Sequence, residues 1–400
     1  MKDKLHIGII GLGGRGYGLM NGVILHMDDI EIVGVCDLYK DRAQDAAYRV
    51  EQVRGNKPFV TQDYKEIIAS SKVEAVIISS AWTGHIEIMI ECMKAGKRVA
   101  TEVGGAYSIE ECWHLIKVYE ETGVPCMLLE NCCYGREEMM VMNMVKQGIF
   151  GEIVHCSGGY QHDLREEISF GKENRHYRLQ NYIYRNCENY PTHELGPIAQ
   201  ILDINRGNRM VSLVSMASKA KGLKEYIKQK KNDDEVLMQT EFEQGDIVTT
   251  IIKCARGETI VLTLDTTLPR AYSRGFRVQG TKGIFMEDNL SVFIDGEHNE
   301  YDFNWKEQWN NIEAYREKYD HPVWKQFMQE GVKGGHGGMD WLVLRAFFDC
   351  VEKDEKMPID VYDIAAWMAI STLSEQSIAM GGQVVSIPDF TNGKWMTRRA

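Results

Sequence analysis

The chain has 400 residues, of which 44% are hydrophobic and 26% charged, and its formal net charge is −12 at pH 7. A chain of this length exceeds one ordinary hydrophobic core, so we expect two domains. The acidic balance, with Lys and Arg dispersed, argues against a nucleic-acid-binding protein. No apolar run approaches the roughly 18 residues that span a membrane, so we expect no membrane partner.

The cysteines and the N-terminus point to a reducing compartment. None of the ten cysteines follows a metal-binding spacing, and several, such as Cys36 and Cys126, lie in apolar runs where a thiol packs as a small hydrophobe. Residues 1–4 lead directly into the first predicted strand, without a signal peptide. We therefore expect a cytoplasmic protein without a bound metal.

A glycine-rich turn lies between an apolar run at residues 5–10 and a predicted helix at 17–27. In a G-x-G-x-x-G turn the first glycine permits the tight turn, the second the approach of a pyrophosphate, and the third close helix–strand packing. The first N–H groups of the helix face the phosphates. The residues expected to bind a dinucleotide here are Gly11, Leu12, Gly13, Gly14, Arg15 and Gly16.

An acidic residue, Asp37, ends the second apolar strand at residues 31–36. It follows the last glycine by about 20 residues, the position at which a carboxylate binds the ribose hydroxyls of NAD. The same carboxylate repels the 2′-phosphate of NADP, so we expect NAD as the cofactor. Arg42 lies close enough in sequence to leave NADP as an alternative.

Strands and helices alternate as far as residue 129, which predicts a doubly wound parallel sheet of the Rossmann type. Ligands bind such sheets beyond the C-terminal ends of the strands. The predicted strands are 73–80, 98–102 and 124–129, and the predicted helices are 41–53, 86–95 and 108–122. The polar residues beyond strand ends are residues 80–85, Glu102 and residues 130–134.

After a helix at 137–148 the pattern changes to alternating strands joined by short turns, which indicates an antiparallel sheet. We expect a Rossmann domain at 1–130 and an α+β domain at 131–400 with an open, mostly antiparallel sheet, its C-terminal tail packing back on the first domain. The predicted strands are 151–160, 211–218, 236–242, 247–254, 259–266, 273–278 and 283–286, with helices at 341–351 and 361–379, a strand or packed tail at 384–388, and a loop with a helical piece at 300–320.

Tyr190 and His193 are the candidates for proton transfer. They lie three apart across a proline, so both can point the same way from a helix start. Histidine titrates near neutrality and tyrosine can donate or relay a proton, although a structural histidine is the alternative. Residues 160–165 and 175–178 suit sugar hydroxyls or form solvated loops. Residues 336–340 form a glycine-flexed active-site loop or a helix cap at Asp340.

The chain resembles the Gfo/Idh/MocA oxidoreductase superfamily over its whole length. That family has a Glu-Lys-Pro motif where this chain has Glu102-Val103-Gly104, and an acid four residues before the histidine where this chain has Asn189 before His193. The strings ENCCYGREEMM, CSGGYQHDLR, ENRHYRL and NCENYPTHELGP are most similar to glycoside hydrolase family 109.

The resemblance implies a glycosidase that cleaves terminal hexosaminides, with N-acetylgalactosaminide as the expected sugar. It implies tightly bound, recycled NAD, with transient oxidation at C3, deprotonation at C2, elimination, water addition and re-reduction. The alternatives are a sugar dehydrogenase with net redox chemistry and a non-catalytic protein that senses NAD(H).

The resemblance also implies roles for individual residues. His193 is the expected base for the C3 hydroxyl, Tyr134 the expected C2 base, and Tyr190 a member of the same proton network; the three roles are exchangeable. Ser80, Trp82, His85, Glu102 and Asn131 are expected at the cofactor, and Tyr160, His162, Arg178, Tyr190 and Arg274 at the substrate. A homo-oligomer, a dimer or higher, is expected through the open sheet face.

Overall fold

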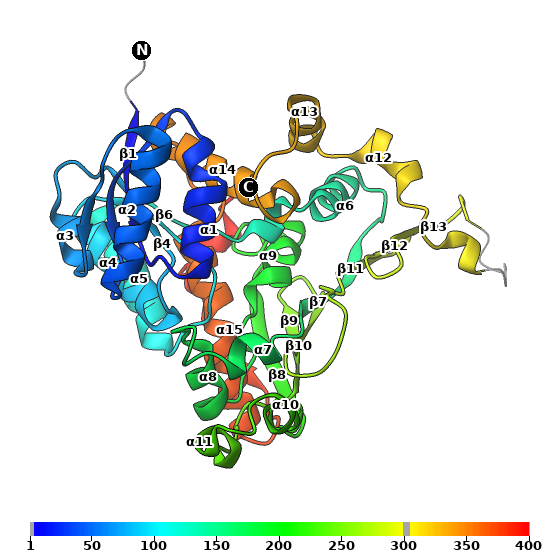
Figure 1. Ribbon diagram of the computed structural model, residues 1–400. Coiled ribbons are helices and arrows are strands. Elements are labelled where there is room, and N and C mark those ends of the chain that lie inside the picture. The colour runs from blue at the N-terminus through cyan, green and yellow to red at the C-terminus, as the bar shows by residue number, and fades with distance from the viewer. Residues whose placement is uncertain (1–3, 299–304, 400) are drawn as a thin grey trace. The chain divides into compact units, whose positions relative to one another are not determined.

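The computed structural model describes residues 4–298 and 305–399 and is shown in Figure 1. The chain divides into two compact units. The first unit comprises Met1–Asn131 and Gly331–Ala365, and the second comprises Cys132–Glu330 and Ala366–Ala400. A segment from the C-terminal part of the chain is thus part of the N-terminal unit.

The sheet of the first unit contains six parallel strands in the order β3-β2-β1-β4-β5-β6, which confirms the predicted doubly wound sheet. The central strand β1 pairs with both β2 and β4, so the strand order reverses beside it. Crevices at such reversals bind ligands. The strands are β1 (Leu5–Ile10), β2 (Ile30–Cys36), β3 (Phe59–Thr61), β4 (Ala75–Ile78), β5 (Arg98–Thr101) and β6 (Cys126–Leu128).

The helices of the first unit are mostly those expected, with ends set by local signals. Helix α5 begins after Ser108, whose hydroxyl accepts from Glu111 N at 3.1 Å in a capping box. Helix α1 ends at Gly22, earlier than predicted, and a one-turn helix η1 (Ile24–His26) follows. With η1, the helices of this unit are α1 (Gly14–Gly22), α2 (Lys40–Arg54), α3 (Tyr64–Ala69), α4 (Trp82–Lys94), α5 (Ile109–Thr122), η4 (His336–Gly338) and α14 (Met339–Lys353).

The sheet of the second unit contains eight strands in the order β13-β12-β11-β7-β10-β9-β8-β14. Neighbouring strands are antiparallel except β7 and β10, which are parallel, so the predicted open, mostly antiparallel sheet is confirmed. The strands are β7 (Ile153–Gln161), β8 (Met210–Ala217), β9 (Ile247–Cys254), β10 (Thr259–Asp265), β11 (Arg277–Gly280), β12 (Gly283–Met286), β13 (Ser291–Ile294) and β14 (Val385–Ser386).

The remaining helices belong to the second unit, apart from two that cross its boundary, η2 and α15. They are η2 (Asn131–Tyr134), α6 (Arg136–Lys146), α7 (Arg165–Ser169), α8 (Arg178–Tyr184), α9 (Thr192–Ile201), α10 (Gly222–Lys230), α11 (Glu235–Gln239), η3 (Trp305–Gln308), α12 (Glu313–Tyr319), α13 (Pro322–Glu330), α15 (Val361–Ala379) and η5 (Lys394–Met396). Residues 299–304, part of the predicted loop at 300–320, lie outside the described residues.

The strand predicted at 236–242 is wrong, because these residues begin within helix α11. Asp234 caps this helix, and its carboxylate accepts from Leu237 N at 2.9 Å. Leu237 is buried while Val236 is 80% exposed, so the apolar alternation does not mark a sheet face. The strand predicted at 273–278 begins later, at Arg277, with a single bridge from Ser273 to Gln161.

Helices cover one face of the eight-stranded sheet. Helix α9 packs against β7, and Ser377 of α15 accepts from the backbone N–H of Ser215 on β8 at 2.9 Å. Side chains on the other face are more accessible: Met216 is 61% and Ile251 is 45% exposed. Val214 on β8 and Val261 on β10, both half-buried, flank Ile251 on the same face.

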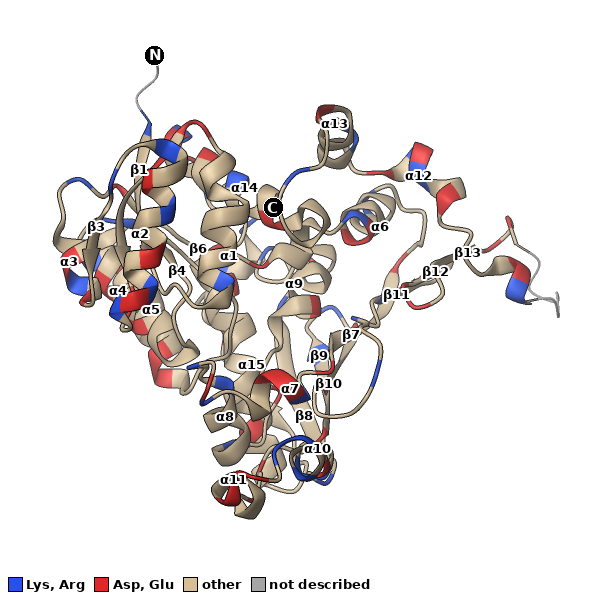
Figure 2. Ribbon diagram, in the orientation of Figure 1, with Lys and Arg blue, Asp and Glu red and all other residues tan. Residues whose placement is uncertain are grey.

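Charge and cysteine distribution follow the pattern of the sequence. Figure 2 shows acidic and basic residues interspersed along helix α2. None of the ten cysteines, all of which the structure describes, is in a disulfide, and all are buried. Among the described residues, no helix combines the length and the apolar character needed to cross a lipid bilayer.

A buried ion cluster joins helices α6 and α9 to the segments around β11 and β12. The Arg274 guanidinium lies 2.5 Å from Glu138, 3.1 Å from Glu194 and 3.2 Å from Glu287. One guanidinium does not balance three carboxylates. Burial and the nearby charge of Glu287 raise the pKa of Glu138 to about 7, although Arg274 opposes this shift.

The close approach of helix α1 to strand β1 gives a first prediction. A Cβ added at Gly16 would lie 2.0 Å from the Gly11 carbonyl oxygen, whereas a Cβ at Gly18, on the same helix, would meet nothing within 4 Å. We expect Gly16→Ala to lower the free energy of unfolding in urea by about 1–3 kcal/mol. The control Gly18→Ala should raise it by about 0.5–1 kcal/mol. Equal effects of the two substitutions would contradict this packing.

The ion cluster predicts a pH-dependent stability. The pKa of Glu138 is about 7 in the folded protein, against an ordinary value of 4.5. Between these two pH values the folded protein keeps the proton of Glu138, whereas the unfolded chain has released it. The free energy of unfolding should therefore fall as the pH rises from 5 to 8. Glu138→Gln should reduce this fall by on the order of 2 kcal/mol in urea titrations. The exposed-site control Glu110→Gln should keep the wild-type slope; an unchanged slope in Glu138→Gln would contradict the raised pKa of Glu138.

Candidate functional site

The glycine turn of the first unit has the geometry that a dinucleotide requires. Gly11 has φ = +91°, and a Cβ there would lie 2.5 Å from the Ser79 carbonyl. A Cβ on Gly14, by contrast, would meet nothing within 4 Å, so the space beside the start of α1 is open. An α-helix leaves its first N–H groups without intrahelical acceptors, and these bind phosphate oxygens. The residues of this turn therefore fit a pyrophosphate.

The Asp37 carboxylate is held rigidly at the end of β2. One oxygen accepts from Leu12 N at 2.6 Å and the other from Tyr39 N at 2.9 Å. A carboxylate has about four acceptor positions, so two remain for ribose hydroxyls. Arg42 also lies here: its guanidinium stacks on the Tyr39 ring at 4.9 Å, and its Nη1 is 3.5 Å from the Cβ position of Gly13. Asp37, which favours NAD, and Arg42, which leaves NADP as an alternative, thus both lie beside the turn.

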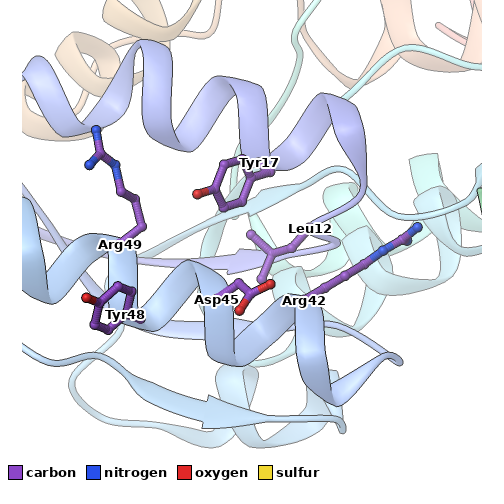
Figure 3. Close-up of a pocket in the computed structure, with 6 residues that line it drawn as sticks. All are labelled: Leu12, Tyr17, Arg42, Asp45, Tyr48 and Arg49. Carbon is purple, nitrogen blue, oxygen red and sulfur yellow. The ribbon is translucent and has the colours of Figure 1, made fainter.

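A hollow of about 450 Å³ opens between helices α1 and α2, next to the glycine turn, as Figure 3 shows. Of the residues that line it, only Leu12 and Arg42 were expected near the cofactor. Asp45, Tyr48 and Arg49 follow Arg42 on one face of α2, and this spacing is the signal that would have found them, whereas Tyr17 lies on α1. The lining residues are Leu12, Tyr17, Arg42, Asp45, Tyr48 and Arg49.

The residues expected at the ends of β4 and β5 are closely packed. His85 is fully buried with Nε2 2.9 Å from the Ser80 carbonyl oxygen, and burial lowers its pKa to about 4, so the ring is neutral at pH 7. Trp82 is buried against Gly104, where a Cβ would lie 2.7 Å from the indole. Position 104 therefore needs a glycine, because any larger residue would clash with the Trp82 ring.

A polar network joins three of the expected cofactor residues. Arg15 Nε donates to Glu102 at 3.0 Å, and its two terminal nitrogens donate to Asp340 at 2.9 and 2.8 Å. Asn131 donates to the same Asp340 carboxylate at 2.9 Å. Of the two roles considered for residues 336–340, the helix cap at Asp340 is wrong, because Gly338 is the N-cap of α14 and Asp340 lies in the first turn of the helix.

The candidate catalytic residues of the second unit form an aromatic cluster at the start of α9. The ring centroids of Tyr190 and His193 are 4.7 Å apart, which confirms that both point the same way. The Tyr160 ring lies 4.4 Å from Tyr190 and 5.1 Å from His193. His162 Nδ1 lies 2.9 Å from the Tyr160 hydroxyl. Tertiary folding thus places β7 and the start of α9 at one site.

Arg178 supplies the positive charge of this cluster. Its guanidinium lies 5.0 Å from the centre of the Tyr190 ring, and its Nε is 2.8 Å from Glu167. Burial raises the pKa of Tyr160 to about 12, although Arg178 opposes the shift. Tyr160 therefore keeps its proton at neutral pH and serves as a neutral phenol.

Tyr272, which was not among the expected site residues, extends the aromatic cluster. Its ring lies 5.1 Å from His162 and 6.4 Å from Tyr160, and the residue is 51% exposed. Tyr272 precedes Arg274 by two residues, but no spacing or local motif marks it, because the contact with β7 spans more than 100 residues.

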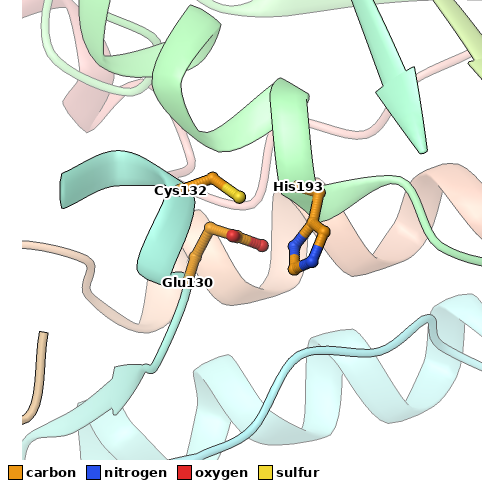
Figure 4. A group of neighbouring side chains, drawn as sticks. All are labelled: Glu130, Cys132 and His193. Carbon is orange, nitrogen blue, oxygen red and sulfur yellow. The ribbon is translucent and has the colours of Figure 1, made fainter. Parts of the chain in front are cut away.

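Tyr134 lies in η2, the short helix that also presents Cys132. Figure 4 shows Cys132 and His193 of the second unit, whose sulfur and ring nitrogen lie within 4.8 Å of each other; Glu130, also drawn, belongs to the first unit. Trp324 Nε1 donates to the Tyr134 carbonyl at 2.9 Å. Arg274 Nη1 lies 3.5 Å from the Cys132 sulfur, so Arg274 connects η2 to the buried ion cluster.

Two family comparisons cover nearly the whole chain. Residues 5–129 match the oxidoreductase family with an NAD-binding Rossmann fold. Residues 134–397 match the C-terminal domain of glycosyl hydrolase 109. Both matches agree with the two sheets described above.

Curated relatives match over almost their full length. The chain is 38% identical to an alpha-N-acetylgalactosaminidase of Tannerella forsythia, over 99% of this chain and 88% of that protein. It is 39% identical to a glycosyl hydrolase family 109 protein of Stenotrophomonas maltophilia, over 99% of this chain and 91% of that protein.

Solved structures with the same fold are more distant in sequence. A scyllo-inositol dehydrogenase from Lactobacillus casei with bound NAD(H) and scyllo-inositol superposes with a TM-score of 0.67 at 12% identity, over 96% of this chain and 99% of that one. An NAD-binding oxidoreductase from Klebsiella pneumoniae gives a TM-score of 0.69 at 14% identity, over 96% and 99%. The protein therefore belongs to glycoside hydrolase family 109, and it is a glycoside hydrolase that contains an NAD-binding Rossmann domain.

Proposed function

We propose that the protein hydrolyses terminal hexosaminides, with N-acetylgalactosaminides as the preferred substrates, and that it does so with tightly bound NAD that is recycled in each turnover. The observation that carries the proposal is the cluster of Tyr160, Tyr190, His193 and Arg178, which combines aromatic rings, an imidazole and a buried cation. Such groups bind sugar rings and hydroxyls. The relative named alpha-N-acetylgalactosaminidase supports the choice of sugar.

Residues of the first unit hold the cofactor in this proposal. The glycine turn binds the pyrophosphate and Asp37 the adenosine ribose, while Ser80, Trp82, His85, Glu102 and Asn131 line the remaining part. Bound NAD supplies a reversible hydride acceptor for carbon C3 of the sugar. The protein itself orients the sugar, moves protons and controls access of water.

The proton transfers are assigned to three residues of the second unit. His193 accepts the proton of the C3 hydroxyl. The Tyr190 ring contacts His193, so we assign the Tyr190 hydroxyl to the same proton network. Tyr134 removes the C2 proton, which an adjacent carbonyl at C3 makes acidic. The group on C1 then leaves by elimination and water adds to the same carbon. The electron pair released at C2 thus forms the double bond that expels the leaving group.

The substrate contacts follow from burial and exposure. Tyr160, His162, Arg178 and Tyr190 form the contact surface for the sugar, because they share one cluster. Arg274 is held by three carboxylates, so we place it behind this surface, where it orients Cys132.

Self-association through the open sheet face belongs to the same proposal. Apolar side chains such as Met216 and Ile251 are accessible on that face. Contiguous exposed apolar surface marks protein–protein contacts, and a second copy of the chain presents the same surface.

Exchange at C2 distinguishes the proposed reaction from direct displacement. We expect an aryl N-acetylgalactosaminide deuterated at C2 to lose deuterium to solvent during turnover, because the proposed route breaks the C2–H bond. Mass spectrometry of the released sugar measures the loss. Full retention of deuterium would contradict the elimination route. Steady accumulation of NADH, followed at 340 nm, would instead support a sugar dehydrogenase with net redox chemistry.

Substitutions at the proposed bases separate chemistry from cofactor binding. His193→Ala and Tyr134→Phe should each lower kcat by roughly 10²–10⁴-fold, because each removes a proton-transfer group. The NAD content of the purified protein should remain at the wild-type level. The exposed-site controls His114→Ala and Tyr184→Phe should keep full activity. Full activity of either active-site variant would reject its assignment.

A further inference from the structure

We propose that Asp340 is a positioning residue of the dinucleotide site. Its carboxylate holds the side chains of Arg15 and Asn131 directly, and that of Glu102 through Arg15. The inference rests on the proposed use of NAD, since these three residues belong to the proposed cofactor site. Asp340 lies in the first turn of α14, and the glycine-rich segment 334–338 precedes it. All of these residues belong to the first unit.

The Asp340 carboxylate contacts nitrogen atoms from three separate parts of the chain. Oδ1 accepts from Arg15 Nη2 at 2.8 Å and from Asn131 at 2.9 Å. Oδ2 accepts from Arg15 Nη1 at 2.9 Å and lies 2.7 Å from His336 Nδ1. These contacts use the four acceptor positions that a carboxylate offers. The side chain is only 3% exposed, so water does not replace these partners easily.

The network also determines what Arg15 contributes. Its guanidinium lies between two carboxylates, with Glu102 at 2.9 Å on one side and Asp340 at 2.8 Å on the other. Two negative charges offset one positive charge. Arg15 therefore fixes the direction of Glu102 instead of adding net positive charge for the phosphates. Bidentate pairing of this kind gives strict geometry as well as attraction.

The electrostatics keep Asp340 ionised. Burial by itself would raise the pKa of Asp340, but hydrogen bonds from His336 and Arg15, with the charge of Arg15, hold this pKa well below its usual range. The carboxylate thus accepts from all its donors throughout the physiological pH range. A neutral acid would donate a proton toward groups that are themselves donors.

The segment before Asp340 is shaped to fit around its carboxylate. Gly334, His336, Gly337 and Gly338 all have left-handed backbone conformations, with φ of +79°, +50°, +64° and +105°. A Cβ on Gly335 would lie 2.6 Å from Asp340 Oδ2, so the backbone passes directly over this oxygen. A left-handed conformation at a non-glycine residue is costly and is retained where the surrounding contacts require it.

The three side chains that Asp340 positions come from the ends of the parallel strands at which ligands bind. Arg15 belongs to the glycine turn after β1, Glu102 follows the end of β5, and Asn131 lies shortly after β6. Parallel sheets bind dinucleotides at this edge. A single carboxylate from a distant part of the chain therefore orders the residues around the cofactor. This contact is one of several that join residues 331–365 to the rest of the first unit, together with the contacts of Arg345 with Asp29 and of Tyr362 with Glu120.

Retention of NAD tests the inference without measuring catalysis. Wild-type protein and Asp340→Asn are loaded with NAD, passed through gel filtration into NAD-free buffer, and assayed for remaining NAD by enzymatic cycling after denaturation. We expect Asp340→Asn to lose NAD at least tenfold faster, because an amide presents an NH₂ group to donors. Asp349→Asn, which removes an ion-paired carboxylate from the same helix, is the control and should retain NAD as the wild type does.

A double-mutant comparison separates positioning from support of helix α14. Because Asp340 and Arg15 belong to one network, the double variant Arg15→Gln/Asp340→Asn should lose NAD more slowly than the product of the two single effects predicts. Multiplicative losses in the double variant would overturn the inference, since they indicate independent effects. His336→Ala, at an exposed position, should speed NAD loss about threefold and provides a test if Asp340→Asn does not fold. No change in that variant would then overturn the inference.

The outcomes also separate this inference from the proposed function. Wild-type protein that retains no NAD after loading would overturn the proposed function and this inference together. NAD retention by Asp340→Asn equal to that of the wild type would overturn this inference alone.

Discussion

The first unit depends on two positions in the glycine turn where no side chain fits. Gly11 faces the Ser79 carbonyl and Gly16 faces the Gly11 carbonyl, both at distances shorter than a Cβ contact allows. These approaches bring the start of α1 against the end of β1. They direct the first N–H groups of the helix toward the edge of the sheet where β1 and β4 end. The position of Asp37 follows from the same turn, since Leu12 N donates to its carboxylate.

The second unit brings its candidate residues together by a different device. The start of α9 places Tyr190 and His193 side by side, and β7 supplies Tyr160 and His162 opposite them. In the same unit, Arg274 contacts three carboxylates, of which Glu138 and Glu194 are buried, and also Cys132. Buried ion pairs are costly to desolvate, and they hold a defined geometry only when every partner is in place. Arg274 therefore links helices α6 and α9 to the short helix that presents Cys132.

In both units, a charged side chain contacts a second polar side chain and holds it in place. Asp340 directs Arg15 and Asn131 in the first unit, and Arg274 contacts Cys132 in the second. In enzymes whose cofactor supplies the electron transfer, the protein contributes orientation and proton control. The proposed reaction needs this kind of support in both units, because it removes a hydride and a proton from neighbouring carbons of one sugar.

Local sequence patterns determined the nature of most elements: the glycine turn, the strand ending at Asp37, the cap at Ser108, and the relation of Tyr190 to His193 across Pro191. Each of these depends on residues within a few positions, where spacing and capping act directly. The strand predicted at 236–242 was wrong for a local reason, because Asp234 caps a helix there. Tertiary structure alone decided that Tyr272 joins Tyr160 and that Asp340 meets Arg15, 325 residues away. These contacts depend on how sheets and helices pack, and no periodicity in the sequence encodes which distant carboxylate a guanidinium will meet.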